Sequence, residues 1–129
     1  MGDTVTRSSV EMKRKPSLAA LRRKLDKLFS AWIRKRDHGK PCITCGKRTE
    51  LQAGHFVKRQ HMSVRWDERN VHGQCVRCNH FLNGNDGEYA YAILNLYGQW
   101  TLDQLMGMKH KTAKFTRSDL EELIAKYST

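Results

Sequence analysis

The chain has 129 residues, enough for one domain of ordinary size with a modest apolar core. Its formal net charge at pH 7 is +11, and most of the excess of lysine and arginine lies in the first 50 residues. This uneven charge favours a polyanionic partner, and nucleic acid rather than a membrane, because the sequence has no lipidation motif and no apolar run that would span a bilayer. We see no secretory signal, so we expect a cytoplasmic protein in which paired cysteines bind metal rather than form disulfides.

The predicted elements begin with a flexible basic tail over residues 1–15 and a basic amphipathic helix over 16–38. Apolar residues recur along this helix with helical spacing, which predicts a stripe that packs in the core. The stripe consists of Leu18, Leu21, Leu25, Leu28, Phe29, Trp32 and Ile33. The cationic remainder is either a solvated face or a surface that follows phosphates, and the uneven charge favours the second interpretation. Its candidate nucleic-acid contacts are Arg22, Arg23, Lys27, Arg34 and Lys35.

Two Cys-x-x-Cys pairs follow the helix, Cys42 with Cys45 and Cys75 with Cys78. Each pair lets two thiolates meet one ion from a tight turn, and two pairs complete a closed tetrahedral site. A closed site leaves no position for a reacting water, so we predict a structural Zn²⁺ that stabilises a region with little apolar bulk. Residues 42–80 are expected to form short strands and turns around it.

Three capping patterns predict helices in the C-terminal part of the chain. They are Asn85 with Glu88, Thr101 with Gln104, and Thr116 with Asp119. We divide this part into a core over 42–98 and a helical cover over 99–129, to which we assign no chemistry.

The segment between the cysteine pairs carries the functional signal. His55 lies in the stretch GHFVKRQH, Asn70 follows 15 residues later, and Asn79 follows the last cysteine directly. This order resembles the HNH (ββα-metal) nucleases, in which a hairpin and a helix hold one catalytic divalent cation. The resemblance implies an α+β fold: a small zinc-stapled ββα-metal core, with the basic N-terminal helix and the C-terminal helices packed around it.

A narrower resemblance covers the chain from about residue 30 to its C-terminus. The strings CITCGK, LQAGHF, NVHGQCVRCN and LNGN are similar to the lambdoid phage NinG family, also called Rap. Members of that family are recombination endonucleases associated with branched DNA such as Holliday junctions. The resemblance implies a metal-dependent DNA endonuclease of phage recombination, acting in the bacterial host cytoplasm. Two cuts are needed to resolve a junction, which favours a homodimer.

The resemblance to the HNH nucleases also implies roles for particular residues. His55 matches the general base that takes a proton from water, and Asn79 matches a ligand of the catalytic cation, Mg²⁺ or Mn²⁺. Asn70 matches a residue that braces the hairpin through backbone hydrogen bonds. We expect Lys58, Arg59 and Arg65 to contact the phosphates of the DNA.

One departure from the superfamily pattern leaves alternatives open. Many HNH enzymes have an aspartate ligand immediately before the base histidine, and here that position is Gly54. Asp67 and His61 are the candidate replacements; Asp67 suits Mg²⁺, whereas His61 would favour softer ions. An inverted assignment, with His55 as ligand and His61 as base, is a further alternative. The missing carboxylate also favours a different function, a non-catalytic zinc-finger module that binds DNA.

Overall fold

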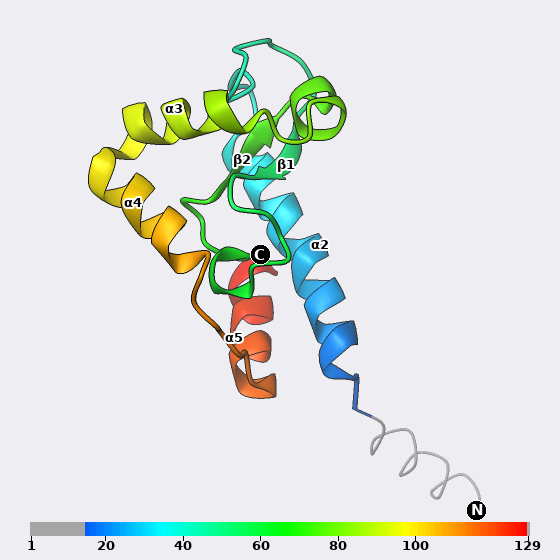
Figure 1. The fold of residues 1–129 in the computed structure, drawn as a ribbon. Helices are drawn as coiled ribbons and strands as arrows, with labels where there is room; N and C mark the ends of the chain where they lie inside the picture. The colour runs from blue at the N-terminus through cyan, green and yellow to red at the C-terminus, as the bar shows by residue number, and fades with distance from the viewer. Residues whose placement is uncertain (1–14, 129) are drawn as a thin grey trace, which may run out of the picture.

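The computed structural model describes residues 15–128 and has an α+β architecture with one two-stranded antiparallel sheet (Figure 1). The predicted N-terminal tail lies, apart from Lys15, outside the described residues. In chain order the elements are helix α2 (Leu18–Arg36), strand β1 (Gln52–His55), the 3₁₀ turn η1 (Met62–Val64), strand β2 (Val71–Gln74), the π-helical turn η2 (Arg77–Phe81), and helices α3 (Asp86–Tyr97), α4 (Gln99–Met108) and α5 (Arg117–Tyr127). Within residues 15–128, no helix combines the length and the apolar character that crossing a membrane requires.

Helix α2 packs through the apolar stripe that its sequence predicts. It begins after Ser17, whose hydroxyl accepts a hydrogen bond from the Ala20 amide at 3.0 Å. The buried members of the stripe are Leu21, Leu25, Phe29 and Ile33. Helices α2 and α5 lie side by side (Figure 1), and the ring of Tyr127 meets that of Phe29 edge-on, with 4.9 Å between the centroids. Among the cationic side chains of α2, Arg23, Lys24, Lys27, Arg34 and Lys35 are exposed.

The sheet lies between α2 and α3. Strand β1 pairs with β2 in a register that sets Gly54 opposite His72 and His55 opposite Val71. Side chains alternate between the two faces of a sheet, so His55 and Val71 share one face while Gly54, His72 and Gln74 share the other. The first face packs on the α2 core through Val71, and His72 on the second face contacts α3. His55 is therefore directed toward α2.

The C-terminal helices differ from the predicted caps at two of three positions. Asn85 precedes α3 in a left-handed conformation (φ 52°) and makes no side-chain capping bond. Helix α4 already begins at Gln99, so Thr101 lies inside its first turn and is buried. At α5 the capping box is present: Thr116 and Asp119 exchange side-chain hydrogen bonds to each other's backbone amides. A second apolar cluster joins α3 and α4 to the loop after β1; it contains Phe56, Val57, Val64, Tyr89, Ile93 and Leu105.

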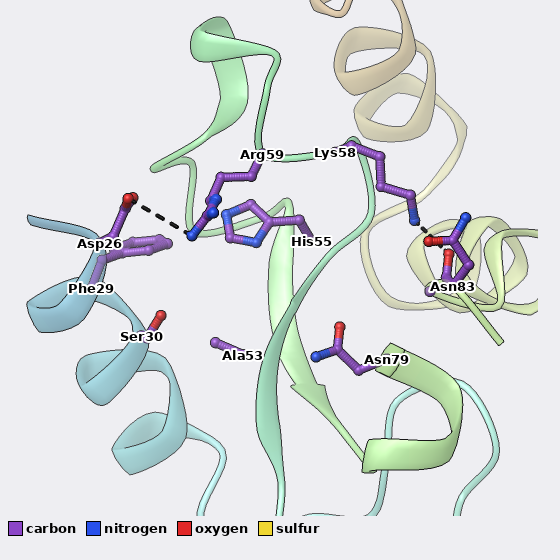
Figure 2. A pocket seen from close by; sticks show the side chains of 10 residues that line it. Asp26, Phe29, Ser30, Ala53, His55, Lys58, Arg59, Asn79 and Asn83 are labelled. Atoms are coloured by element: carbon purple, nitrogen blue, oxygen red, sulfur yellow. Dashed lines mark hydrogen bonds and ion pairs between the residues drawn. The ribbon is translucent and has the colours of Figure 1, made fainter. Parts of the chain in front are cut away.

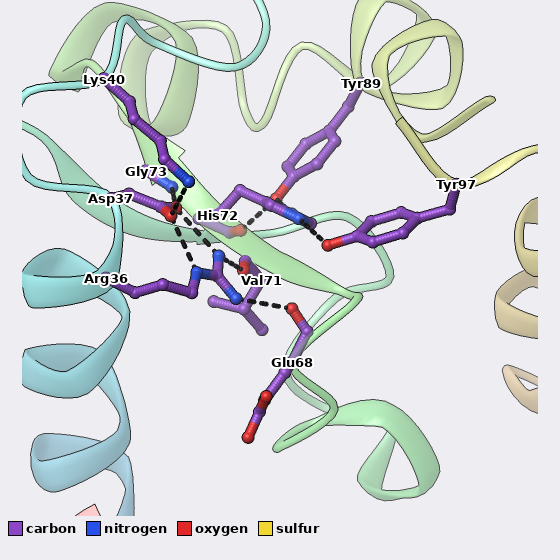
Figure 3. Close-up of polar contacts among 10 residues, drawn as sticks. Arg36, Asp37, Lys40, Glu68, Val71, His72, Gly73, Tyr89 and Tyr97 are labelled. Carbon is purple, nitrogen blue, oxygen red and sulfur yellow. Dashed lines mark hydrogen bonds and ion pairs between the residues drawn. The ribbon is translucent and has the colours of Figure 1, made fainter. Parts of the chain in front are cut away.

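A buried polar network ties the end of α2 to β2 (Figure 3). Arg36 donates to the carbonyl oxygens of Glu68 at 3.0 Å and Val71 at 2.7 Å, and it pairs with Asp37 at 2.8 Å. Asp37 in turn accepts a hydrogen bond from the Gly73 amide at 2.8 Å. The carboxylate and guanidinium compensate each other's charge, which lets both sit beside the sheet.

A second set of hydrogen bonds runs through His72 to the backbone of β1. The Tyr89 hydroxyl donates to the Gly54 carbonyl at 2.6 Å, so it accepts from His72 Nδ1 at 3.2 Å. His72 Nε2 then accepts from the Tyr97 hydroxyl at 2.8 Å (Figure 3). Burial lowers the pKa of His72 to about 4, which agrees with a neutral ring. The network fixes the peptide that immediately precedes His55.

Candidate functional site

The four cysteines form a compact cluster that could hold a structural metal ion, as their spacing predicts. Their sulfur atoms all lie within 4.8 Å of one another, and Cys42, Cys75 and Cys78 are buried whereas Cys45 is exposed. All four are free thiols, and four sulfur donors gathered at this spacing fit tetrahedral coordination. The cluster sits at the end of β2, where the Ile43 amide also bonds to the Gly73 carbonyl at 3.0 Å. A bound ion would therefore fix the loop over 42–48 to the end of the sheet.

His55, at the end of β1, is held by a single backbone contact. Its Nε2 lies 2.9 Å from the Arg65 carbonyl oxygen, which can only accept, so Nε2 carries the proton and Nδ1 carries the lone pair of the neutral ring. Burial lowers the pKa of His55; the carbonyl and Asp26 oppose the shift, whereas the charges of Arg59 and Arg65 add to it. The ring is therefore neutral near pH 7, the state in which it can take a proton from water.

Asn70 holds together the loop that supplies this carbonyl. It is fully buried, and its Oδ1 accepts from the Val57 amide at 2.8 Å while Nδ2 donates to the carbonyls of Val57 and Val64 at 2.9 and 3.1 Å. Its own carbonyl accepts from the Phe56 amide at 2.8 Å. These bonds close the loop from 56 to 70. A contribution of Asn70 to catalysis stays a prediction.

His55 and Asn79 line one cavity of about 240 Å³ (Figure 2). Asn79 comes from η2, where its Nδ2 donates to Gln52 Oε1 at 2.9 Å. Asp26 and Ser30 of α2 form the opposite wall. The cavity thus combines a neutral histidine with an amide oxygen, the donor type that hard cations accept.

Neither predicted replacement for the missing aspartate lies among the residues lining this cavity. Asp67 is bound to Arg69, with a 2.8 Å ion pair and a bond from the Arg69 amide. His61 instead lines a separate apolar groove beside α3 and α4. The structure brings neither side chain together with Asn79.

The three cations predicted to contact phosphate differ in their availability. Lys58 and Arg59 line the cavity, and the side chain of Arg59 is 64% exposed. Lys58 is tied to the Asn83 carbonyl and Asp86, each at 2.8 Å. The side chain of Arg65 is only 16% exposed, and its guanidinium is bound by Asp26. Arg65 is thus engaged inside the protein and leaves Arg59 as the more available cation.

Asp26 is the site residue that the sequence did not reveal. It pairs with Arg65, accepts a bond from the Trp66 indole at 3.0 Å, and lies 3.9 Å from Arg59. Asp26 binds the Arg65 guanidinium, and the Arg65 carbonyl accepts the hydrogen bond from His55. Asp26 therefore helps to position the His55 ring. The available signal was modest: Asp26 is the single acidic residue between positions 15 and 36.

The basic residues of α2 include a row that borders the cavity. Arg23, Lys27 and Arg34 are exposed and share one helix face with Ser30, since their spacing follows the helical repeat. We call these three residues the basic row. Of the other predicted contacts, Lys35 is exposed on another side of the helix and Arg22 is half-buried.

Comparisons with known proteins agree on one family. The family model described as "Bacteriophage Lambda NinG protein" matches residues 6–129. Protein ninG of Escherichia phage 933W is 38% identical over 101 residues, covering 76% of this chain and 50% of the relative. Protein ninG of Salmonella phage P22 is 36% identical, and that of Escherichia phage lambda 35%, each over 101 residues that cover 76% of this chain and 49% of the relative. The chain thus spans about half the length of the curated relatives it matches. No solved structure matches it. The family-model match covers most of the chain, which therefore belongs to the NinG family.

Proposed function

We propose that the chain is a metal-dependent DNA endonuclease of the HNH type, selective for branched DNA. The observation that carries this proposal is the arrangement around the cavity: a neutral His55, oriented by a backbone carbonyl, on the hairpin, and an amide oxygen of Asn79 on the helical turn that follows it. The order of β1, β2 and η2 agrees with the ββα-metal plan.

In the proposed reaction, His55 acts as the general base. The Nδ1 lone pair removes a proton from a water molecule as the water oxygen bonds to phosphorus. The bond from phosphorus to the 3′ oxygen breaks, and that oxygen receives a proton from solvent. The contact with the Arg65 carbonyl keeps the ring in one tautomer and stabilises the positive charge that it gains.

The donor set of the cavity fits a hard divalent cation, with Asn79 Oδ1 as one ligand. When bound there, Mg²⁺ or Mn²⁺ would stabilise the charge that develops on the phosphate and on the leaving oxygen. Such ions keep several waters and bind substrate phosphates, so the protein needs to supply few ligands. The cysteine cluster, occupied by Zn²⁺ in this proposal, has no open position and serves to hold the hairpin.

The basic row supports DNA as the substrate. Arg23, Lys27 and Arg34 extend along α2 on both sides of Ser30, which lines the cavity. A phosphate backbone following this row would pass the cavity mouth, where Arg59 is exposed. Selectivity for junctions rests on the family resemblance alone.

A non-catalytic zinc-finger module that binds DNA is the second candidate, favoured by one observation. Asp26 is the single carboxylate lining the cavity in the described part of the chain, and Arg65 neutralises it. No acidic ligand is thus available at the place where many HNH enzymes have one.

Incubation of the zinc-loaded protein with supercoiled plasmid and with a synthetic four-way junction separates the two functions. The nuclease predicts strand cleavage with Mg²⁺ or Mn²⁺ that EDTA abolishes. Binding of the junction with no cleavage under any of these conditions would contradict the nuclease and support the module.

A further inference from the structure

Gln74, the last residue of β2, has a buried amide oxygen whose bonding capacity is unused. The residue is fully buried, and Nε2 donates to the Gly84 carbonyl at 2.9 Å and to the Thr44 hydroxyl at 3.1 Å. The Gly84 carbonyl can only accept, so the amide nitrogen must face it and Oε1 must point the other way. Within residues 15–128, Oε1 finds no hydrogen-bond partner. Buried polar atoms are nearly always paired with the protein, an ordered water or an ion, so this oxygen has room for such a partner.

This oxygen occupies the space of the side chain that Gly54 lacks. A Cβ atom placed on Gly54 would lie 1.9 Å from Gln74 Oε1 and 3.0 Å from Asn79 Oδ1. The first distance is a severe clash, so a side chain at position 54 would force the end of the Gln74 side chain to move. Both amide oxygens thus border the same point. In this arrangement the glycine at position 54 leaves the space that the Gln74 amide fills.

We propose that Gln74 Oε1 and Asn79 Oδ1 together bind the divalent cation, and that Gln74 replaces the acidic ligand many HNH enzymes carry at the position of Gly54. The inference rests on the proposed nuclease function and specifies its metal site. Amide oxygens suit Mg²⁺ and Mn²⁺, and waters and substrate phosphate complete the coordination. Asn79 is half-buried and lines the cavity with His55, so the cation enters from that side.

A site built from two neutral amides has a distinctive consequence. Without a carboxylate the protein supplies no charge to the cation, so binding is weak in the free protein and strengthens when DNA brings its phosphate. We expect Mn²⁺ affinity to rise by on the order of tenfold or more when a non-cleavable phosphorothioate junction is bound.

The test measures Mn²⁺ binding to the zinc-loaded protein in the presence of that junction by electron paramagnetic resonance. The unfolding temperature of each variant is recorded in parallel. Gln74→Ala should weaken binding by about tenfold or more. Gly54→Asp alone should lower the unfolding temperature, because the new side chain collides with Gln74. The double variant Gly54→Asp/Gln74→Ala should recover both the fold and Mn²⁺ binding, since the aspartate then has room. Gln99→Ala, an exposed change on α4, is the matched control and should behave as wild type.

Three outcomes overturn the inference. If Gln74→Ala binds Mn²⁺ like wild type while Asn79→Ala does not, the cation has another ligand, and the nuclease proposal stands. If Gln74→Ala unfolds, and the folded double variant binds Mn²⁺ no better than Asn79→Ala does, the aspartate at position 54 does not replace Gln74. Gln74 is then not a ligand of the cation. If the zinc-loaded wild type binds no Mn²⁺ even with the junction, the proposal of a metal-dependent nuclease is wrong as well.

Discussion

Replacing Asn70 tests whether one buried amide holds the loop that orients His55. Asn70→Ala removes three hydrogen bonds and leaves the Val57 amide and the carbonyls of Val57 and Val64 without partners inside the protein. A net contribution of about 1 kcal/mol for each bond, with the added cost of unpaired buried groups, gives a loss of about 2–4 kcal/mol. This is a large part of the stability of a typical domain.

The assay is urea denaturation of the zinc-loaded protein, with the free energy of unfolding extrapolated to water. Asn95→Ala, an exposed change on α3, is the matched control and should alter that free energy by no more than about 0.5 kcal/mol. A loss below about 1 kcal/mol in Asn70→Ala would refute the reasoning, because it would mean that water or a loop shift satisfies the abandoned groups.

Asn70→Asp sharpens the test because it keeps the shape of the side chain. One oxygen still accepts from the Val57 amide, but the other faces two carbonyl oxygens, so the fold favours the protonated acid. The pKa of the new carboxyl is therefore raised on folding, and the native state binds the proton first. Stability relative to wild type at the same pH should recover as the pH falls from 7 to 5. No recovery would show that the carbonyl contacts are unimportant.

Three further predictions concern the metal, pH and DNA. Cys75→Ser should abolish the cooperative thermal transition together with the bound zinc, measured by calorimetry and metal analysis; an unchanged transition would mean that the cluster is not structural. Burial lowers the pKa of His72 to about 4, so the unfolded chain takes up the proton first as the pH falls. The free energy of unfolding of the wild type should therefore decrease by up to about 3 kcal/mol between pH 7 and pH 4. That pH dependence of the unfolding free energy should be shallower in His72→Asn, and equal slopes would contradict it. Lys27→Ala should weaken DNA binding and reduce the salt slope by about 1, whereas Lys114→Ala should not; equal effects would remove the basic row from the interface.

Features set by short-range spacing could be predicted from the sequence. The buried stripe of α2 follows from apolar residues at helical intervals, and each Cys-x-x-Cys pair needs only a tight turn to present two thiolates. The two pairs lie 30 positions apart, and their meeting could be predicted because one tetrahedral ion takes four thiolates. The capping box at Thr116 is equally local.

Features that depend on packing between distant segments could not be predicted. Asp26 is a site residue because α2 lies against the loop that carries Arg65, 39 positions later in the chain. That pairing also turns Arg65, an expected phosphate contact, into an internal one. Gln74 is significant because the sheet register sets it diagonally across from Gly54 and η2 brings Asn79 beside both. The residue types alone do not indicate these contacts between distant segments.

The central claim, that His55 is the base of a metal-dependent nuclease, is tested most directly by single-turnover cleavage of a four-way junction by His55→Ala. The control is His110→Ala, which removes an exposed histidine from the same protein. Loss of the general base should reduce the rate by about 10²–10⁴-fold, with zinc content and junction binding unchanged and His110→Ala as active as wild type. Cleavage by His55→Ala at the wild-type rate would contradict the account.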